Sequence, residues 1–224
     1  MKGTPVHLAL PGGEVLAGQV VVATAGYTPD LGLFRGRLLP VHLQAVVTEP
    51  LDEHAREFLG WSGREGILDS RRLFNYFRLT ADDRIVFGGG LPRYRWSGRT
   101  EEPHGPVPAL DRVVTELRTT FPAEARLRVA GGWTGVIGYT LDALPAIGQQ
   151  RDNPSVVHAV GWCGHGVALA VACGEWLTRL LCAGAAPEDL PWYRDCPPLL
   201  PTEPLRWAAF AAAVRFQSFL DHIC

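Results

Sequence analysis

The segment from Gly161 to Gly166, Gly-Trp-Cys-Gly-His-Gly, has residue types and a spacing suited to binding chemistry. Residues 155–160 before it predict a short buried strand, and the apolar run from Val167 predicts a helix ending near Gly184. A strand that turns through glycines into a helix leaves free backbone N–H groups, which favour negative charge. Because glycine has no side chain, a flat ligand or a phosphate can approach this backbone closely. The segment predicts either a cofactor-facing turn or a tight structural turn.

Cys163 and His165 are the reactive side chains of this turn. The helix dipole lowers the pKa of a thiol at a helix start, which would favour a nucleophilic Cys163. A Cys/His hydrolase needs a histidine from elsewhere in the fold, and His165 is too near in sequence for that role. As a metal pair the two residues have poor spacing, and the chain has no Cys-x-x-Cys motif. Cys163 is therefore interpreted as a small neutral turn residue, and the backbone of His165 is expected to matter more than its ring.

A second small-residue turn, Thr-Ala-Gly at residues 24–26, follows a strand predicted within residues 14–23. That strand would form a hairpin with residues 6–10. Its last part has no polar alternation after Gln19 and is expected to be buried on both faces. In open α/β sheets, ligands bind beyond the carboxyl ends of strands. A ligand-facing turn and a plain connecting turn both remain open for this segment.

Four aromatic and basic side chains are candidates for a substrate pocket. Tyr76 and Arg78 share one face of a strand predicted for residues 71–80, where the guanidinium would pair with a carboxylate and the phenol would stack on a ligand. An ordinary surface face of a sheet fits them equally. Trp133 and Tyr139 lie among glycines, which suits an aromatic pocket wall and an aromatic core alike. The chain has no Gly-x-Ser-x-Gly elbow and no Walker loop, and no catalytic residue is assigned.

The remaining elements are of two kinds, with α/β material at both ends of the chain and an antiparallel sheet in the middle. The expected fold class is therefore mixed α/β. Residues 1–30 and 140–224 are expected to form one domain, and residues 31–139 an inserted antiparallel-sheet domain. The further expected elements are strands at 38–49, 85–90 and 127–137, a helix at 107–121 ended by Pro122, and a last helix at about 205–222.

Composition limits the class of protein. The chain has 224 residues and a net charge of −2, and 47% of its residues are hydrophobic, which suits a soluble chain with a real core. No basic excess indicates a nucleic-acid partner. The longest apolar runs are shorter than the roughly 20 residues of a membrane span, and the start lacks the apolar core of a signal peptide. We expect a cytoplasmic protein with neither nucleic acid nor membrane as a partner.

Five segments together resemble a known family. In their order and spacing they are similar to the C-terminal part of FAD-dependent amine and amino-acid oxidoreductases of the D-amino-acid oxidase superfamily. The resemblance is strongest to its γ-glutamylputrescine oxidoreductase and glycine/sarcosine oxidase branch. The segments are residues 20–27, residues 40–51, Tyr76 to Arg78 with residues 87–89, residues 133–135 with Thr140, Asp142, Pro145 and Gly148, and residues 161–169.

The resemblance implies FAD bound in a partial, three-layer α/β domain, with the substrate covered by the antiparallel sheet. It places the turn after the first buried strand near the cofactor, and the 161–167 turn at the pyrimidine end of the isoalloxazine ring. A helix N-terminus there would stabilise the negative charge that develops on the ring during hydride transfer, by roughly 3–4 kcal/mol. The cofactor residues so implied are Ala23, Thr24, Ala25, Gly26, Gly161, Gly164, His165, Gly166 and Val167.

The resemblance also implies a reaction, the oxidation of a C–N bond of an amine or amino acid by hydride transfer to flavin. It places Tyr76, Arg78, Trp133 and Tyr139 around the substrate.

Two departures from the family pattern matter. The chain lacks the Gly-x-Gly-x-x-Gly turn of the dinucleotide-binding βαβ unit, so we expect a C-terminal portion: a truncated product, a fragment, or one half of a split enzyme whose N-terminal half is on another chain. The alternative is a non-catalytic remnant or subunit that associates with a partner chain. The chain reads Gly135-Val136 where amino-acid oxidases carry an arginine, which favours an amine substrate or a carboxylate held by Arg78.

Overall fold

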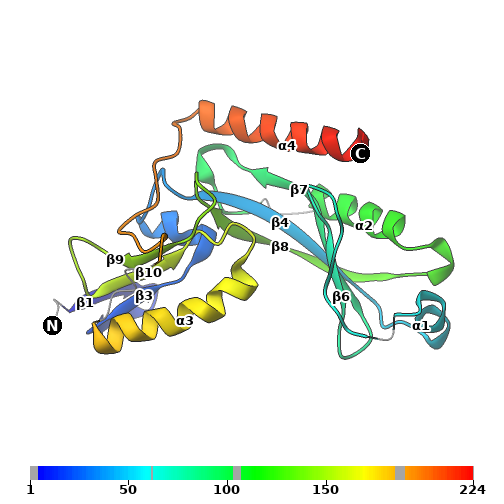
Figure 1. Ribbon diagram of the computed structural model, residues 1–224, viewed down its shortest axis with the longest axis horizontal. Helices are drawn as coiled ribbons and strands as arrows, with labels where there is room; N and C mark the ends of the chain where they lie inside the picture. The colour runs from blue at the N-terminus through cyan, green and yellow to red at the C-terminus, as the bar shows by residue number, and fades with distance from the viewer. Residues whose placement is uncertain (1–4, 62, 103–106, 185–189, 224) are drawn as a thin grey trace. The chain divides into compact units, whose positions relative to one another are not determined.

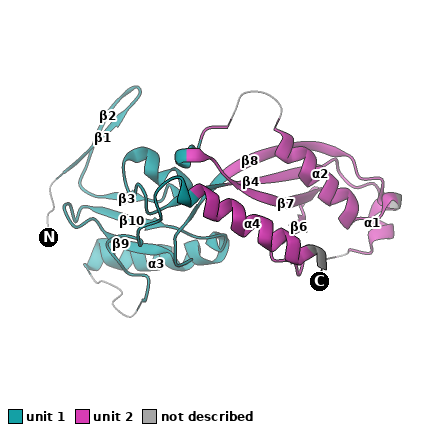
Figure 2. Ribbon diagram, turned by 90° about the horizontal axis from the view of Figure 1, so that it is seen from above, with its two compact units in different colours: residues 1–41, 97–100, 136–206 teal, residues 42–96, 101–135, 207–224 magenta. Residues whose placement is uncertain are grey.

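The computed structural model describes residues 5–61, 63–102, 107–184 and 190–223. The chain divides into two compact units (Figure 2). Unit 1 comprises Met1–Val41, Ser97–Thr100 and Val136–Arg206, and unit 2 comprises His42–Trp96, Glu101–Gly135 and Trp207–Cys224. These divisions differ from the expected domain limits at residues 30 and 140, and they group most of the last helix with the antiparallel sheet.

Unit 1 is built on a three-stranded sheet with the order β3-β10-β9. β3 (Val20–Val22) pairs in parallel with β10 (Val156–Val160), which pairs antiparallel with β9 (Ala146–Gln149). Helix α3 (Gly166–Ala183) buries Cys173 against this sheet and ends at Gly184, whose φ of 62° is the left-handed conformation of a helix C-cap (Figure 1). The predicted strand, turn and helix around residues 161–166 are all present.

The start of unit 1 differs from the prediction in two ways. Residues 14–23 do not form one strand: β2 (Gly13–Ala17) pairs with β1 (Val6–Leu10) as a separate hairpin, and β3 begins after Gly18. The expectation that this strand is buried on both faces is also wrong. Val22 is buried but Val21 is 43% exposed, because β3 is an edge strand and the described residues cover only one of its faces.

Unit 2 is built on a five-stranded sheet with the order β5-β6-β7-β4-β8, and its division from unit 1 falls inside β4 and β8. Helix α2 covers one face, where Val113 and Leu117 pack on Val46, Ile85 and Phe87. The apolar stripe predicted for residues 107–121 therefore forms the core of this unit. The elements are β4 (Leu39–Thr48), β5 (Ile67–Leu68), β6 (Tyr76–Leu79), β7 (Ile85–Tyr94), β8 (Val129–Tyr139), α2 (Pro108–Thr120) and α4 (Leu205–Ile223).

Two segments of unit 2 were not anticipated. Helix α1 (Glu53–Leu59) is set by its ends: the Asp52 side chain accepts from the N–H of Ala55 at 2.8 Å, and Gly60 closes the helix with a φ of 58°. The strand predicted for residues 71–80 is shorter than expected, because only Tyr76–Leu79 pairs with β7 and the preceding residues form a loop.

Helix α3 is long and apolar enough to cross a membrane, judged by length and composition only. It has 18 residues and a mean hydropathy of 1.4, and 11% of it is buried in this structure. Val167 and Val171 are 95% and 80% exposed. The core helices of soluble proteins have the same length and composition, so these properties alone do not assign α3 to a membrane.

Candidate functional site

The two glycine-containing turns of the sequence lie at one edge of the unit 1 sheet. β3 and β10 run in parallel, with Val22 opposite His158, so their carboxyl ends point the same way. Residues 23–26 leave the end of β3, and residues 161–166 leave the end of β10. The carboxyl edge of adjacent parallel strands is the usual place for a ligand in an α/β sheet. All nine residues predicted to hold a cofactor belong to these two turns or to the start of α3.

Close backbone packing joins the first turn to the end of β8. A Cβ atom on Gly26 would lie 2.6 Å from Cγ1 of Val136 and 2.7 Å from the carbonyl oxygen of Ile137. A Cβ atom on Gly138 would lie 3.3 Å from the carbonyl oxygen of Ala25. The turn is held from within by Thr28, whose hydroxyl donates to the carbonyl oxygen of Ala25 at 2.8 Å. Gly26 is therefore required by packing.

Cys163 has a structural role in the second turn. The residue is 5% exposed, and its thiol donates to the carbonyl oxygen of Gly161 at 3.1 Å. The N–H of Thr140 donates to the sulfur at 3.4 Å. Its own N–H donates to the carbonyl oxygen of Gly138 at 3.2 Å. Cys163 has a φ of 49°, which is the left-handed backbone region that residues other than glycine seldom adopt. These contacts agree with the interpretation of Cys163 as a turn residue rather than a nucleophile.

The start of α3 presents backbone donors. The N-cap residue is His165, and its side chain makes no capping hydrogen bond. The first N–H groups of a helix have no partner inside the helix, and here the second helical residue, Val167, is 95% exposed. Gly164 has a φ of 92°, which is accessible to glycine at little cost. The edge of the sheet therefore offers N–H groups and the positive end of an 18-residue helix dipole to a ligand.

Tyr139 is the predicted substrate residue that lies beside this turn. A Cβ atom on Gly164 would be 3.4 Å from the Tyr139 hydroxyl oxygen. Burial, and secondarily the neighbouring Cys163 thiol, raises the pKa of Tyr139. The phenol therefore stays protonated at neutral pH and can donate a hydrogen bond.

Tyr76, Arg78 and Trp133 belong to unit 2. Tyr76 lies across Gly88 of β7, where the two residues pair in register, and burial raises the pKa of its phenol. Phe77 packs into the core with α2, so by the alternation of the strand Tyr76 and Arg78 project from the opposite face. Trp133 is half exposed on β8. Among the described residues, no hydrogen bond or ring contact joins Trp133 to the other two.

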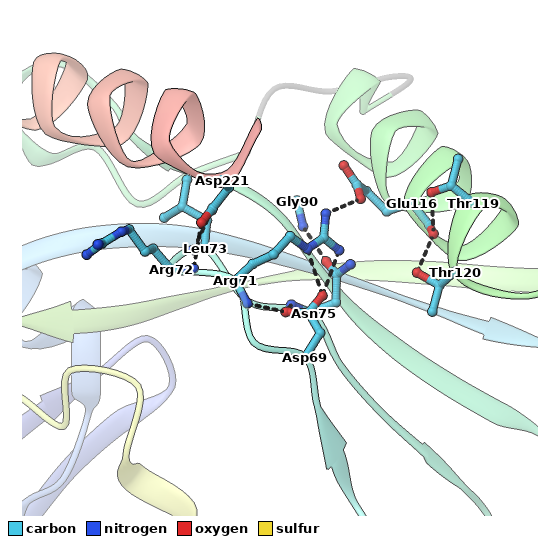
Figure 3. A network of polar contacts seen from close by, with 10 residues as sticks. All are labelled: Asp69, Arg71, Arg72, Leu73, Asn75, Gly90, Glu116, Thr119, Thr120 and Asp221. Carbon is cyan, nitrogen blue, oxygen red and sulfur yellow. Dashed lines mark hydrogen bonds and ion pairs between the residues drawn. The ribbon is translucent and has the colours of Figure 1, made fainter. Parts of the chain in front are cut away.

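A polar network holds the loop that leads into β6 (Figure 3). Asp69 accepts from the backbone N–H of Asn75 at 3.0 Å and pairs with Arg71, whose guanidinium also reaches Glu116 of α2 at 2.8 Å. Asp221 near the end of α4 accepts from two backbone N–H groups, those of Arg72 at 2.8 Å and the next residue at 3.0 Å. This network holds the loop that precedes β6, the strand that carries Tyr76 and Arg78.

Two polar pairs were missed from the sequence. In unit 2, Nδ1 of the fully buried His42 lies 2.7 Å from Oε1 of Glu102. In unit 1, Asp142 pairs with Arg194, which also donates to the carbonyl oxygen of Leu144 at 2.7 Å. The Arg194 guanidinium lowers the pKa of Asp142 to about 2. Neither pair has a sequence signal, because its partners are joined only by the fold.

Comparison with known proteins identifies the family of the chain. The family described as FAD dependent oxidoreductase (DAO) matches residues 2–180. The γ-glutamylputrescine oxidoreductase of Escherichia coli K12 is 30% identical over 184 residues, which cover 80% of this chain and 40% of that protein. The probable oxidoreductase OrdL of Rhizobium meliloti is 27% identical over 220 residues, covering 98% of this chain and 46% of that protein. The chain thus spans less than half the length of these relatives.

A third relative, the sarcosine oxidase subunit beta of Rhizobium meliloti, is 24% identical over 196 residues, covering 86% of this chain and 44% of that protein. Among solved structures, fructosyl peptide oxidase from E. terrenum superposes with a TM-score of 0.67 at 16% identity, covering 86% of this chain and 48% of that one. This structural likeness shows the fold. From the family match over residues 2–180, the chain belongs to the FAD-dependent oxidoreductases of the DAO family.

Proposed function

We propose that this chain carries the flavin-ring wall and the substrate sheet of an enzyme that oxidises a C–N bond of a small amine or amino acid. The observation that supports this most directly is the uncapped start of α3, at the carboxyl edge of the parallel pair β3–β10. Backbone donors and a helix dipole at such an edge suit a ligand that gains negative charge. The family match supports flavin as that ligand.

The residues present fit the ring end of FAD. The approach to the start of α3 is formed by Gly164 and Gly166, where no Cβ atom narrows the path, and by Val167, a strongly exposed residue. When bound, the flavin would supply the two-electron acceptor for the oxidation. The N–H groups at the start of α3 would stabilise charge at the pyrimidine edge, and an oriented set of donors of this kind contributes roughly 3–4 kcal/mol to a transition state. No residue of the chain carries the Gly-x-Gly-x-x-Gly turn for the nucleotide end.

The substrate residues proposed on each of the two units would bind the substrate rather than perform acid–base chemistry. The Arg78 guanidinium would pair with a substrate carboxylate. The protonated Tyr139 phenol would donate a hydrogen bond, and Tyr76 and Trp133 would supply aromatic surface against which the alkyl part of an amine packs. A substrate amine that arrives neutral needs no strong protein base, and no catalytic base is proposed.

Flavin binding and reduction test this proposal. The purified chain is titrated with FAD and with lumiflavin, which is the ring without the nucleotide, and quenching of flavin fluorescence is followed. We expect both to bind, and Gly164→Ala to weaken both, because a side chain there is strained and narrows the approach. Gly174→Ala is the matched control, since Gly174 lies within α3 and a Cβ atom on it meets nothing within 4 Å.

The reaction is tested on the flavin-loaded protein without oxygen. γ-Glutamylputrescine, sarcosine and glycine are added in turn, and loss of the visible flavin absorbance is followed. At least one of these substrates should reduce the flavin, and Arg78→Gln should slow the reduction by all three, because each carries a carboxylate, more than it slows reduction by putrescine, which carries none. A protein that binds flavin with ordinary affinity but is reduced by no amine would overturn the assignment of the reaction.

A second proposal concerns a partner chain. Val167 and Val171 are strongly exposed, 11% of α3 is buried, and Val21 of the edge strand β3 is also exposed. An apolar helix and a neighbouring sheet edge of this kind are typical of a surface that another element covers. We propose that a chain carrying the dinucleotide-binding half covers it. Co-expression with such a chain should give a yellow complex. If the chain alone is monomeric and stays monomeric and colourless in that co-expression, this proposal fails.

A further inference from the structure

Unit 2 contains a groove that the proposed reaction does not use. It has a volume of about 440 Å³ and is walled by the end of β7, the first turns of α2 and one side of α4. This volume lies within the usual range of small-molecule sites, about 300–1,000 Å³. Phe77 and Leu79 face α2, so the groove wall formed by α2 stands on the face of the sheet away from Tyr76 and Arg78.

Four arginines line the groove: Arg93, Arg95, Arg112 and Arg215. Among the residues that the structure describes, no acidic side chain lines it, and none of the four guanidinium groups makes a hydrogen bond or an ion pair. Nη1 of Arg95 is buried without any partner. This contrasts with Arg71 of the same unit, which two carboxylates neutralise. Four unpaired guanidinium groups around one hollow repel one another, and an anion in the groove would relieve that repulsion.

The rest of the lining is aromatic and apolar. Trp207 and Phe210 of α4 reach the groove beside Tyr94, and Tyr94 and Phe210 are in ring contact with centroids 5.9 Å apart. Trp207 is 44% exposed and therefore presents ring surface to a ligand. A guanidinium fork binds phosphate oxygens in pairs, and aromatic faces stack on flat rings.

We propose that this groove binds a small anion with several negative charges and a flat ring, the chemistry of a nucleoside diphosphate. The charged end lies among Arg95, Arg112 and Arg215, and the ring lies against Trp207. A hollow of this size encloses a small molecule, whereas an extended polyanion would need a basic surface running beyond it. The site is separate from the flavin turn and binds its ligand without a chemical step.

Calorimetric titration of the full chain tests the proposal at about 0.15 M salt, where weak surface electrostatics is screened. The probes are ADP, pyrophosphate and adenosine. We expect saturable binding of one ADP, binding of pyrophosphate at least about tenfold weaker because it lacks the ring, and no measurable binding of adenosine. Non-saturating ADP binding, or equal affinity for ADP and pyrophosphate, would overturn the proposal.

Two arginines of α2 make a matched pair of variants. Arg112 lines the groove, and Arg118 is exposed on the same helix and does not. Arg112→Gln should weaken ADP binding at least about tenfold, and Arg118→Gln, which removes the same charge, by less than about twofold. Equal effects would show that ADP binds elsewhere, the flavin turn included, and would overturn the proposal. So would a short single-stranded DNA that displaces ADP and binds more tightly. Thermal melting of both variants checks that they fold.

Discussion

The backbone N–H of Cys163 donates to the carbonyl oxygen of Gly138 at 3.2 Å, and this bond joins the turn after β10 to the end of β8. The turn after β3 packs on the same part of β8, because Gly26 lies against Val136 and Ile137. The two turns of the candidate site are therefore held by one strand. Their relative position depends on these close contacts with β8.

Replacement of Gly26 tests this arrangement. Gly26→Ala would place a Cβ atom 2.6 Å from Cγ1 of Val136 and 2.7 Å from a backbone oxygen that cannot move alone. We expect a loss of about 1–3 kcal/mol in the free energy of unfolding, measured by urea denaturation. Gly18→Ala is the control, since a Cβ atom there meets nothing within 4 Å. Equal stabilities of the two variants would contradict the packing argument.

Alanine substitution of Gly164, just before α3, and of Gly174, inside α3, should change the stability of the protein in opposite directions. Gly164 has a φ of 92°, so Gly164→Ala forces an alanine into a left-handed conformation and should destabilise by about 1–2 kcal/mol. Gly174 lies inside α3 in open space, so Gly174→Ala should stabilise by about 0.5–1 kcal/mol through helix propensity. Thermal melting of the two variants and the unchanged chain measures both. A stabilising Gly164→Ala would show that the turn has another conformation in solution.

His158 makes unit 1 sensitive to acid. The side chain is fully buried, and desolvation lowers its pKa from 6.5 to about 4, although its contact with the carbonyl oxygen of Arg194 opposes that shift. Because the folded pKa lies below the unfolded value, the unfolded chain takes up the proton first, and stability falls as the pH drops from about 6.5 to about 4. The loss should reach about 3 kcal/mol, with neutral His158 fully tolerated above pH 6.5.

The measurement is the free energy of unfolding in urea at several pH values between 7.5 and 4. His158→Gln removes the titrating group, so its curve should be flatter than that of the unchanged chain across this window, whatever its absolute stability. Parallel curves for the two proteins would show that His158 does not titrate there.

Asp221 should control how α4 docks on unit 2. Its carboxylate accepts from the backbone N–H groups of Arg72 and Leu73 (Figure 3). Asp221→Ala removes both hydrogen bonds, one exposed and one partly buried, and we expect a loss of about 1 kcal/mol in the free energy of unfolding, concentrated locally. Hydrogen exchange should quicken at residues 71–73 and along α4 while β4 stays protected. Asp152→Ala, an exposed change in unit 1, serves as the control.

Local patterns in the sequence determined most of the helices and several strands. The apolar spacing of residues 107–121 produced α2, and the glycine at 184 ended α3 where the left-handed C-cap stands. The strands expected at residues 71–80 and 85–90 are joined by the short turn at residues 81–84, and they pair as the β6–β7 hairpin, since neighbouring strands need only a short connection. Helix periodicity and turn chemistry act over a few residues, so they can be seen without a partner. The family resemblance was also visible at this level and is confirmed.

Only the tertiary structure decided which distant segments meet. The parallel pairing of β3 with β10 brings residues 23–26 beside the 161–166 turn, and no local pattern specifies it. The short β6 and its preceding loop depend on Asp221 from the far end of the chain. The four arginines of the groove come from separate parts of the chain, and in the sequence each of them is an ordinary surface charge. Pairing, ion pairs and burial between remote segments depend on how all the elements pack at once, and a one-dimensional pattern does not carry that information.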